Sequence, residues 1–213
     1  MGSPTHYFSP SPGSPSRPGT VRLDLPDLSL TLRTDRGVFS ADRVDAGTKV
    51  LLADTPPPPT TGHLLDLGCG YGPVALTLAT RAPAATVWAV DVNDRARGLT
   101  RRNAADAGLG NVRVAGPEDV PDDVRFAALW SNPPVRVGKA TLHGLLTTWL
   151  ARLAPEGHAR LVVHKHLGAD SLQRWLVGQG WAAERERSRL GYRVLAVRAA
   201  DADVADGADG AGP

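Results

Sequence analysis

The sequence has very little cysteine. Cys69 is the single cysteine in 213 residues, which excludes an internal disulfide and a cysteine-cluster zinc site. Two of the six histidines, His164 and His166, alternate along an expected strand and would point to its opposite faces. Because that spacing does not bring two imidazoles to one ion, we expect no metal centre.

Long hydrophobic runs are also lacking. The apolar stretches at 127–130 and 161–163 fall far short of the roughly 20 residues that cross a bilayer. Residues 1–18 lack the apolar segment of a secretory signal. The length suits one domain of ordinary size. We therefore expect a soluble, cytoplasmic protein without a membrane partner.

Positive charge outweighs negative charge outside the C-terminus. Residues 200–213 hold four of the 22 acidic residues and no Lys or Arg, so the rest of the chain carries a formal charge of +6, against +2 for the whole. A positive body suits an anionic partner such as RNA, although many basic surfaces only solvate a protein. We expect a disordered acidic tail at 200–213 and a flexible segment at 1–19, which is rich in Pro, Ser and Gly.

A pattern of strands and helices fills the remaining sequence. Residues 20–24 and 28–34 alternate apolar and polar side chains and predict a small β-hairpin, and 43–53 predicts a short helix. Consecutive prolines end this N-terminal part, 20–55, and a Rossmann-like core is expected over 62–199. In the core, strands are expected at 63–67, 86–91, 112–115, 126–131, 160–165, 182–187 and 192–198, and helices at 74–81, 94–107, 139–153 and 169–179.

This order of elements predicts the fold class. Strands that alternate with helices form a parallel, doubly wound sheet. The link between the third and fourth core strands is too short for a long helix, and the last two strands are close enough to pair as an antiparallel hairpin. We therefore expect an α/β fold with a seven-stranded, mostly parallel sheet, an antiparallel C-terminal hairpin and the small N-terminal β-hairpin.

A glycine-rich loop follows the first core strand. It reads Asp66-Leu-Gly68-Cys-Gly70-Tyr-Gly72 and opens a helix, where glycines let a ligand approach the backbone. Asp91 ends the next strand, in a position to accept both hydroxyls of a ribose. A glycine turn with an acid that caps the following helix explains the same residues without a ligand.

The order of the glycines distinguishes two cofactors. A dinucleotide loop has the pattern G-x-G-x-x-G, whereas this loop has G-x-G-x-G preceded by Asp66. A carboxylate in that place can organise the loop and meet a cationic ligand. The pattern resembles motif I of class I methyltransferases, and it favours S-adenosyl-L-methionine over NAD.

A second motif, Asn132-Pro133-Pro134, closes the fourth core strand at the edge where open α/β sheets bind ligands. The Asn132 side-chain oxygen and the Pro133 carbonyl could accept both hydrogens of an amino group. Such acceptors favour a pyramidal nitrogen whose lone pair faces a methyl group. Asn is too weak a base to remove the proton, so orientation must supply the acceleration. The alternative is an ordinary proline turn.

Together these motifs resemble the RsmC-like, small-domain methyltransferases that modify guanine N2 in 16S ribosomal RNA. The resemblance covers about residues 7–198 and would make 20–199 a methyltransferase domain. Its most family-specific part is Phe39-Ser40 followed by Asp42-Arg43. The matching stretches are 6–9, 37–40, 42–45, 47–48, the glycine loop, 90–93, 131–134 and 191–195.

The resemblance implies a role for each matching residue. The implied contacts are Asp66, Gly68 and Gly70 to the methionine part of the cofactor, Asp91 to its ribose, Asn93 beside its adenine, Gly47 and Thr48 closing over it, and Asn132 and Pro133 to the target amino group.

The sequence departs from the family pattern at two positions. Pro117 stands where the family has an acid for the adenine amine, so Asp119 (or Glu118) is expected to replace it. Val135 stands where relatives acting on adenine or glutamine have an aromatic residue, which favours guanine.

The expected partner is ribosomal RNA or the small ribosomal subunit. Residues placed near the ligand edge for target or phosphate contacts are Pro134, Arg136, Lys139, Lys165 and Arg43, with scattered solvated charge as the alternative. Two other functions stay open, a methyltransferase for a protein amide or small molecule and a non-catalytic RNA-binding module. The N-terminal hairpin either helps to dock RNA or only covers the sheet.

Overall fold

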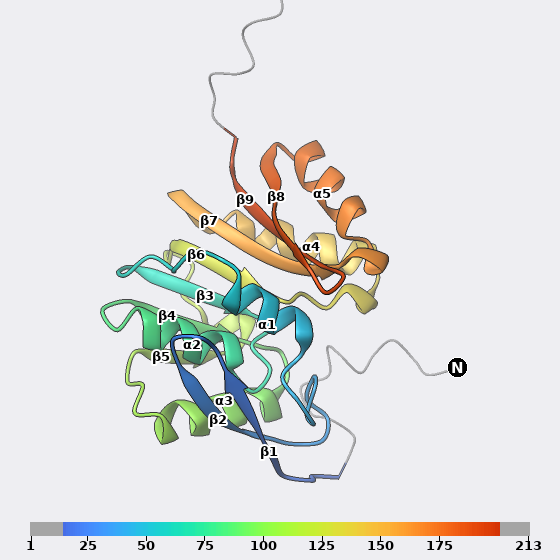
Figure 1. Ribbon diagram of the computed structural model, residues 1–213. Helices are drawn as coiled ribbons and strands as arrows, with labels where there is room; N and C mark the ends of the chain where they lie inside the picture. Colours follow the sequence, from blue (N-terminus) through green and yellow to red (C-terminus); the bar gives the residue numbers. More distant parts are fainter. Residues whose placement is uncertain (1–14, 201–213) are drawn as a thin grey trace, which may run out of the picture.

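A seven-stranded sheet forms the centre of the protein (Figure 1). The computed structural model describes residues 15–200. In spatial order the strands are β5 (Val112–Ala115), β4 (Thr86–Val90), β3 (His63–Leu67), β6 (Phe126–Ser131), β7 (Leu153–His164), β9 (Tyr192–Ala199) and β8 (Trp181–Arg189). Strands β5 to β7 are parallel, and β9 is antiparallel to both neighbours. The predicted fold class is confirmed.

The strand order reverses direction at β3. This strand pairs in parallel with β4 on one side and with β6 on the other, although β6 comes three strands later in the chain. The connections after β3 and β6 therefore leave in opposite directions and open a crevice at the carboxyl ends of the strands. Both sequence motifs follow these two strands, so the topology brings them to one place.

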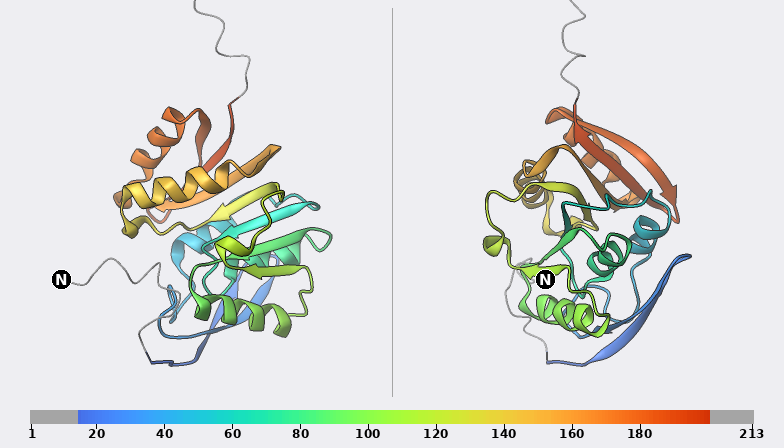
Figure 2. Two further views of the ribbon diagram at one scale, coloured as in Figure 1. Left: turned by 180° about the vertical axis from the view of Figure 1, so that it is seen from behind. Right: turned by 90° about the vertical axis from the view of Figure 1, so that its left-hand side faces the viewer.

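Helices cover both faces of the sheet (Figure 2). One face packs against α1 (Ala46–Ala53), α2 (Pro73–Arg81) and α3 (Asp94–Asp106), and the other packs against α4 (Lys139–Leu150) and α5 (Ala169–Gly178). Successive strand residues alternate between the two layers, since Leu64 belongs to the first core and Leu65 to the second. Sheets buried on both faces need such continuous apolar strands.

The N-terminal β-hairpin covers helices rather than the sheet. It consists of β1 (Gly19–Asp24) and β2 (Ser29–Thr34), and it lies over α2 and α3 (Figure 1). The side chains of Val21, Leu23 and Leu32 are buried in the core that these helices share. Asn103 on α3 bonds to both backbone groups of Arg33, at 2.8 and 3.0 Å. The hairpin was expected either to help dock RNA or to cover the sheet, and the second expectation was wrong because the hairpin covers helices.

Several boundaries differ from those expected. Helix α4 ends at Leu150, and β7 begins at Leu153 instead of residue 160. The reason is an irregular start to β7, where pairing with β6 is interrupted after Leu153 and resumes at His158. Gly157 lies in this interruption, where an added Cβ would stand 2.5 Å from a β6 carbonyl oxygen. A strand that starts with a bulge has no regular alternation to reveal it.

The chain ends were predicted to be flexible. Residues 1–14 and 201–213 lie outside the described part of the chain. For residues 15–19 the prediction was wrong, because the Ser16 hydroxyl donates to Asp35 at 2.7 Å and Gly19 begins β1. Asp35 is buried, so its carboxylate needs such donors.

Within residues 15–200, no helix has the length and apolarity to cross a membrane.

Candidate active site

A cavity of about 540 Å³ opens at the carboxyl ends of β3, β4, β6 and β7. It lies at the reversal of strand order, where this class of sheet binds ligands. Residues from both sequence motifs and from the N-terminal segment meet in its wall. Of the residues predicted for the site, those that line the cavity are Thr48, Asp66, Gly68, Gly70, Asp91, Asn93, Asn132, Pro133, Pro134 and Arg136.

Asp66 anchors the glycine loop from inside the protein. Its side chain is 1% exposed and accepts a hydrogen bond from the Ala75 backbone N–H at 2.8 Å, in the first turn of α2. Burial raises the pKa of Asp66 to about 8. Gly72 precedes the helix with φ of 96°, and an added Cβ there would lie 2.7 Å from a Leu76 methyl. The carboxylate and the glycine conformation together set the shape of the loop.

Asp91 joins the loop to the end of β4. Its carboxylate accepts from the backbone N–H groups of Gly70 and Asn93, each at 2.9 Å. Burial raises the pKa of Asp91, against the effect of these donors. Since an ionised carboxylate has about four acceptor sites, Asp91 can also take the hydroxyls of a ribose.

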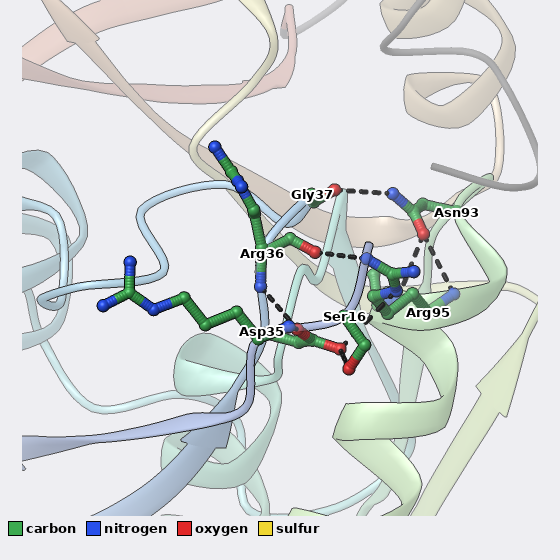
Figure 3. Close-up of polar contacts among 8 residues, drawn as sticks. Ser16, Asp35, Arg36, Gly37, Asn93 and Arg95 are labelled. Carbon is green, nitrogen blue, oxygen red and sulfur yellow. Dashed lines mark hydrogen bonds and ion pairs between the residues drawn. The ribbon is translucent and has the colours of Figure 1, made fainter. Parts of the chain in front are cut away.

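Residues 37–39 form a wall of the cavity, and contacts of residues 35–37 fasten this wall to α3 (Figure 3). Asn93 caps α3 by accepting from Arg95 N–H at 2.9 Å, and its amide donates to the Gly37 carbonyl at 3.1 Å. The Arg95 guanidinium donates to the Arg36 carbonyl and lies 3.6 Å from the Asp35 carboxylate. Asn93 thus joins the wall to the start of α3, so its side chain stabilises the fold and also lines the cavity.

The Asn-Pro-Pro turn extends from the end of β6 into the cavity. The Asn132 side-chain amide donates to Asp45 Oδ2 at 2.9 Å and to Thr48 Oγ1 at 3.1 Å. The Pro133 carbonyl accepts from Val135 N–H at 2.8 Å, which fixes its direction within a tight turn. A carbonyl oxygen has two lone pairs, so one remains for a ligand.

Five predicted site residues do not line the cavity. Asp119 accepts from Gly116 N–H at 3.0 Å and faces a separate hollow beside α3 and β5, so it lies outside the lining of the cavity. Gly47 is buried below Tyr192, whose Cε1 would lie 2.6 Å from an added Cβ. The exposed side chains outside the lining are Arg43, Lys139 and Lys165.

The cavity also contains residues that sequence reasoning did not assign to it. Phe39 and Leu167 line it while 59% and 46% exposed, which gives its mouth an apolar rim. His164 and Tyr192 lie in contact, with ring centroids 4.9 Å apart. His164 ends β7 at the ligand edge, a signal available in the sequence. Tyr192 reaches the cavity only because β9 pairs with β7, which the sequence alone did not place at the site.

The chemistry of the lining suits S-adenosyl-L-methionine. Three carboxylates, Asp45, Asp66 and Asp91, line the cavity. Two of them have pKa values raised by burial, so a cationic ligand would relieve the cost of ionising them. A sulfonium and an ammonium group meet that need, and Asp91 is free to accept from a ribose. Fold and site together define a class I, S-adenosylmethionine-dependent methyltransferase.

The chain belongs to the methyltransferase small domain family, whose model matches residues 29–196. It is 35% identical over 169 residues to the uncharacterized protein YbxB of Bacillus subtilis (strain 168), covering 78% of this chain and 84% of that protein. It is also 38% identical over 141 residues to the ribosomal RNA small subunit methyltransferase C of Aeromonas hydrophila. That match covers 65% of this chain but only 40% of the relative.

Among solved structures, the chain is similar to a 16S rRNA N2 methyltransferase (RsmC) of T. thermophilus in complex with AdoMet and guanosine. The TM-score is 0.72 at 26% identity, and the match covers 89% of this chain and 52% of that one. A ribosomal protein L11 methylase of Lactobacillus delbrueckii shares the fold alone, with a TM-score of 0.59 at 18% identity over 74% of this chain and 85% of that one. The chain therefore spans about half the length of the RsmC protein.

Proposed function

We propose that this methyltransferase modifies the exocyclic N2 amino group of a guanine in 16S ribosomal RNA. The proposal rests above all on one observation, that Asn132 and Pro133 share a cavity with Asp66, Gly68 and Asp91. An acceptor for two amino hydrogens and a site for a cationic nucleoside thus face the same space. Neither a pure RNA-binding module nor a simple proline turn needs that combination.

The residues of the cavity divide the work of methyl transfer. S-adenosyl-L-methionine supplies a methyl group on a positively charged sulfur, which leaves as a neutral thioether. Asp66, the glycine loop and Asp91 would hold it. Asn132 Oδ1 and the Pro133 carbonyl would accept the two hydrogens of the amine, so that its lone pair points at the methyl carbon. As the N–C bond forms, the C–S electrons return to sulfur, and the nitrogen then loses one proton to water. Positioning can contribute roughly 7–11 kcal/mol in favourable cases.

The rim of the cavity suits a nucleobase. Phe39 and Leu167 expose apolar surface beside the polar acceptors, and large exposed apolar side chains commonly mark binding sites. Val135, which also lines the cavity, offers no aromatic ring next to the second proline. This lining supports a guanine target over adenine or a protein glutamine. Arg136, which is exposed at the same cavity, is placed to meet a phosphate.

The relatives support the same substrate. The T. thermophilus protein was solved with AdoMet and guanosine, and the Aeromonas relative is a ribosomal RNA small subunit methyltransferase. The family model, which matches residues 29–196, spans every residue that lines the cavity here. Because the chain spans only part of each of them, the target has to be tested on this chain itself.

Mass mapping of modified ribosomal RNA tests the proposal. Ribosomal RNA from a deletion strain would be incubated, as naked RNA and as assembled small subunit, with the protein and methyl-labelled cofactor. The proposal predicts one additional methyl group on one guanine base, located at N2. Label in protein or in small molecules, with none in RNA, would contradict the proposed target while leaving the methyltransferase class intact.

A further inference from the structure

The Asn132 side chain is held in one orientation by residues of the α1 region. Both hydrogens of its amide have acceptors, Asp45 Oδ2 at 2.9 Å and Thr48 Oγ1 at 3.1 Å. The reversed amide would place Oδ1 against a carboxylate, and an ionised carboxylate can accept but not donate. The two contacts therefore fix which end of the amide is the free acceptor. That end is Oδ1, the atom that the proposed reaction needs.

The Asp45 carboxylate accepts hydrogen bonds from several parts of the chain. As the N-cap of α1 it accepts from Gly47 N–H at 2.8 Å and from Thr48 N–H at 3.2 Å. It is also hydrogen-bonded to the Tyr192 side chain, whose pKa is raised by burial and by the Asp45 charge. A phenol with a raised pKa stays protonated, so Tyr192 donates to Asp45. Asp45 thus links α1, β6 and β9.

This arrangement leaves little room for movement. Thr48 is 5% exposed. Between it and Asp45, an added Cβ on Gly47 would lie 2.6 Å from the Tyr192 ring and 2.9 Å from Asp45 Oδ2. Any larger residue at position 47 would have to push these groups apart. The close packing means that Asn132 is bound to a rigid support.

The contact with Asp45 has an electrostatic consequence as well. A hydrogen bond from an amide to a charged acceptor is short and strong, and it draws electron density through the amide towards its oxygen. Oδ1 therefore becomes a better acceptor. The negative charge behind the amide also favours the positive charge that develops on the nitrogen as its bond to the methyl carbon forms.

We infer that Asp45 and Thr48 are positioning residues for methyl transfer, which orient and polarise the Asn132 amide. The inference rests on the proposed use of Asn132 as acceptor. It assigns the Thr48 hydroxyl to Asn132, where the family resemblance suggested closure over the cofactor. Tyr192 supports the same role through its bond to Asp45.

Hydrogen exchange of the Asn132 side chain tests the orientation without any reaction. In a ¹⁵N-labelled protein, the side-chain NH₂ signals of Asn132 are identified by their loss in Asn132→Ala. Because both hydrogens are bonded, they should exchange slowly with water. In Asp45→Asn and Thr48→Val, exchange should be faster by about tenfold or more, the factor that corresponds to the loss of one ordinary hydrogen bond. Asn remains a good N-cap, so Asp45→Asn should keep α1 intact.

Matched controls separate this role from general damage. Thr55→Val removes a hydroxyl that bonds Leu51 at the end of the same helix, at 2.6 Å. Asp106→Asn changes a carboxylate that pairs with Arg33 on the hairpin. Neither control should alter the Asn132 exchange rate or kcat. Thr48→Ser keeps the hydroxyl and should retain most of the wild-type values.

Kinetics give the second measurement. Thr48→Val, Asp45→Asn and Tyr192→Phe should lower kcat, by about tenfold for the first two and less for the third, with cofactor Kd changed by less than about threefold. Wild-type kcat and exchange in Thr48→Val would overturn the inference, as would equal losses in kcat and cofactor affinity. If the exchange rates change as expected but the wild-type protein leaves guanine unmethylated, the orientation of Asn132 stands and the proposed substrate fails.

Discussion

Asp66 illustrates how a single residue couples the cavity to pH. It is buried and its carboxylate accepts one backbone N–H, so that without a cation its pKa rises from 3.8 to about 8. A raised folded-state pKa means that the unliganded protein loses stability as the pH increases between these two values. A cationic cofactor should favour ionised Asp66 and reverse this effect.

We therefore expect cofactor binding to release protons and to strengthen as the pH increases from 6 to 7.5, by less than about tenfold per pH unit for one group. Calorimetry in buffers of different ionisation enthalpy measures both quantities. Asp66→Asn should remove most of the pH dependence, weaken binding and raise the melting temperature of the unliganded protein at pH 8. Affinity that falls over this range in the wild type would contradict the role of Asp66.

The residue scale also shows what motifs can and cannot predict. Asp66, Asp91 and Asn132 were identified because each lies at or just after the end of a strand, in a pattern that carries its own physical reason. Asp119 was placed by family resemblance next to Pro117, where the pattern departs, and it faces elsewhere. Asp45 belonged to a matching stretch, but its contact with Asn132 spans 87 positions and no local pattern reveals such a pair.

At the scale of elements, the stability of the N-terminal hairpin depends on the helices that it packs against. Two strands alone are marginally stable, and here Leu23 and Leu32 bury their side chains against α2 and α3. The hairpin in turn leads into the wall at residues 37–39, which Asn93 and Arg95 fasten to α3 (Figure 3). Packing of the hairpin therefore supports the cavity from a distance.

Leu23→Ala is expected to destabilise the protein by about 2–5 kcal/mol, because it leaves a cavity at a fully buried position. Urea denaturation measures the change. Arg22→Ala, on the exposed face of the same strand, should cost less than about 1 kcal/mol. A similar small effect for both variants would show that the hairpin does not share the core.

At the level of elements, strongly periodic segments were predictable and irregular ones were not. The ranges of β3, β5 and β6 agree with expectation residue for residue. Strand β7 begins earlier than predicted because its first part is irregular and contains Pro155 and Gly157, which break the alternation. The alternation of apolar and polar residues along a strand follows from which side chains are buried, so it can be recognised in the sequence. A bulge depends on the pairing with the neighbouring strand, so it cannot.

At the scale of the whole molecule, the sheet order joins two loops that are about 60 residues apart. The glycine loop follows β3 and the Asn-Pro-Pro turn follows β6, and these strands are neighbours. The positions of both motifs at the carboxyl edge could be predicted, since parallel strands end at one edge. The contribution of β9 through Tyr192 could not, because it depends on how the C-terminal hairpin pairs with β7.

The account assigns cofactor binding to the loop after β3 with Asp91, and the target amino group to Asn132 after β6. A comparison of Asn132→Ala with Asp91→Ala tests this assignment most directly. Calorimetry and methyl transfer to ribosomal RNA would be measured for both variants. Asn132→Ala should bind S-adenosyl-L-methionine with an affinity within about threefold of wild type and lose at least about 100-fold in turnover, since its role lies with the acceptor. Asp91→Ala should instead lose at least about tenfold in cofactor affinity. Wild-type turnover in Asn132→Ala would contradict the account, because the amino group would then need no acceptor at the end of β6.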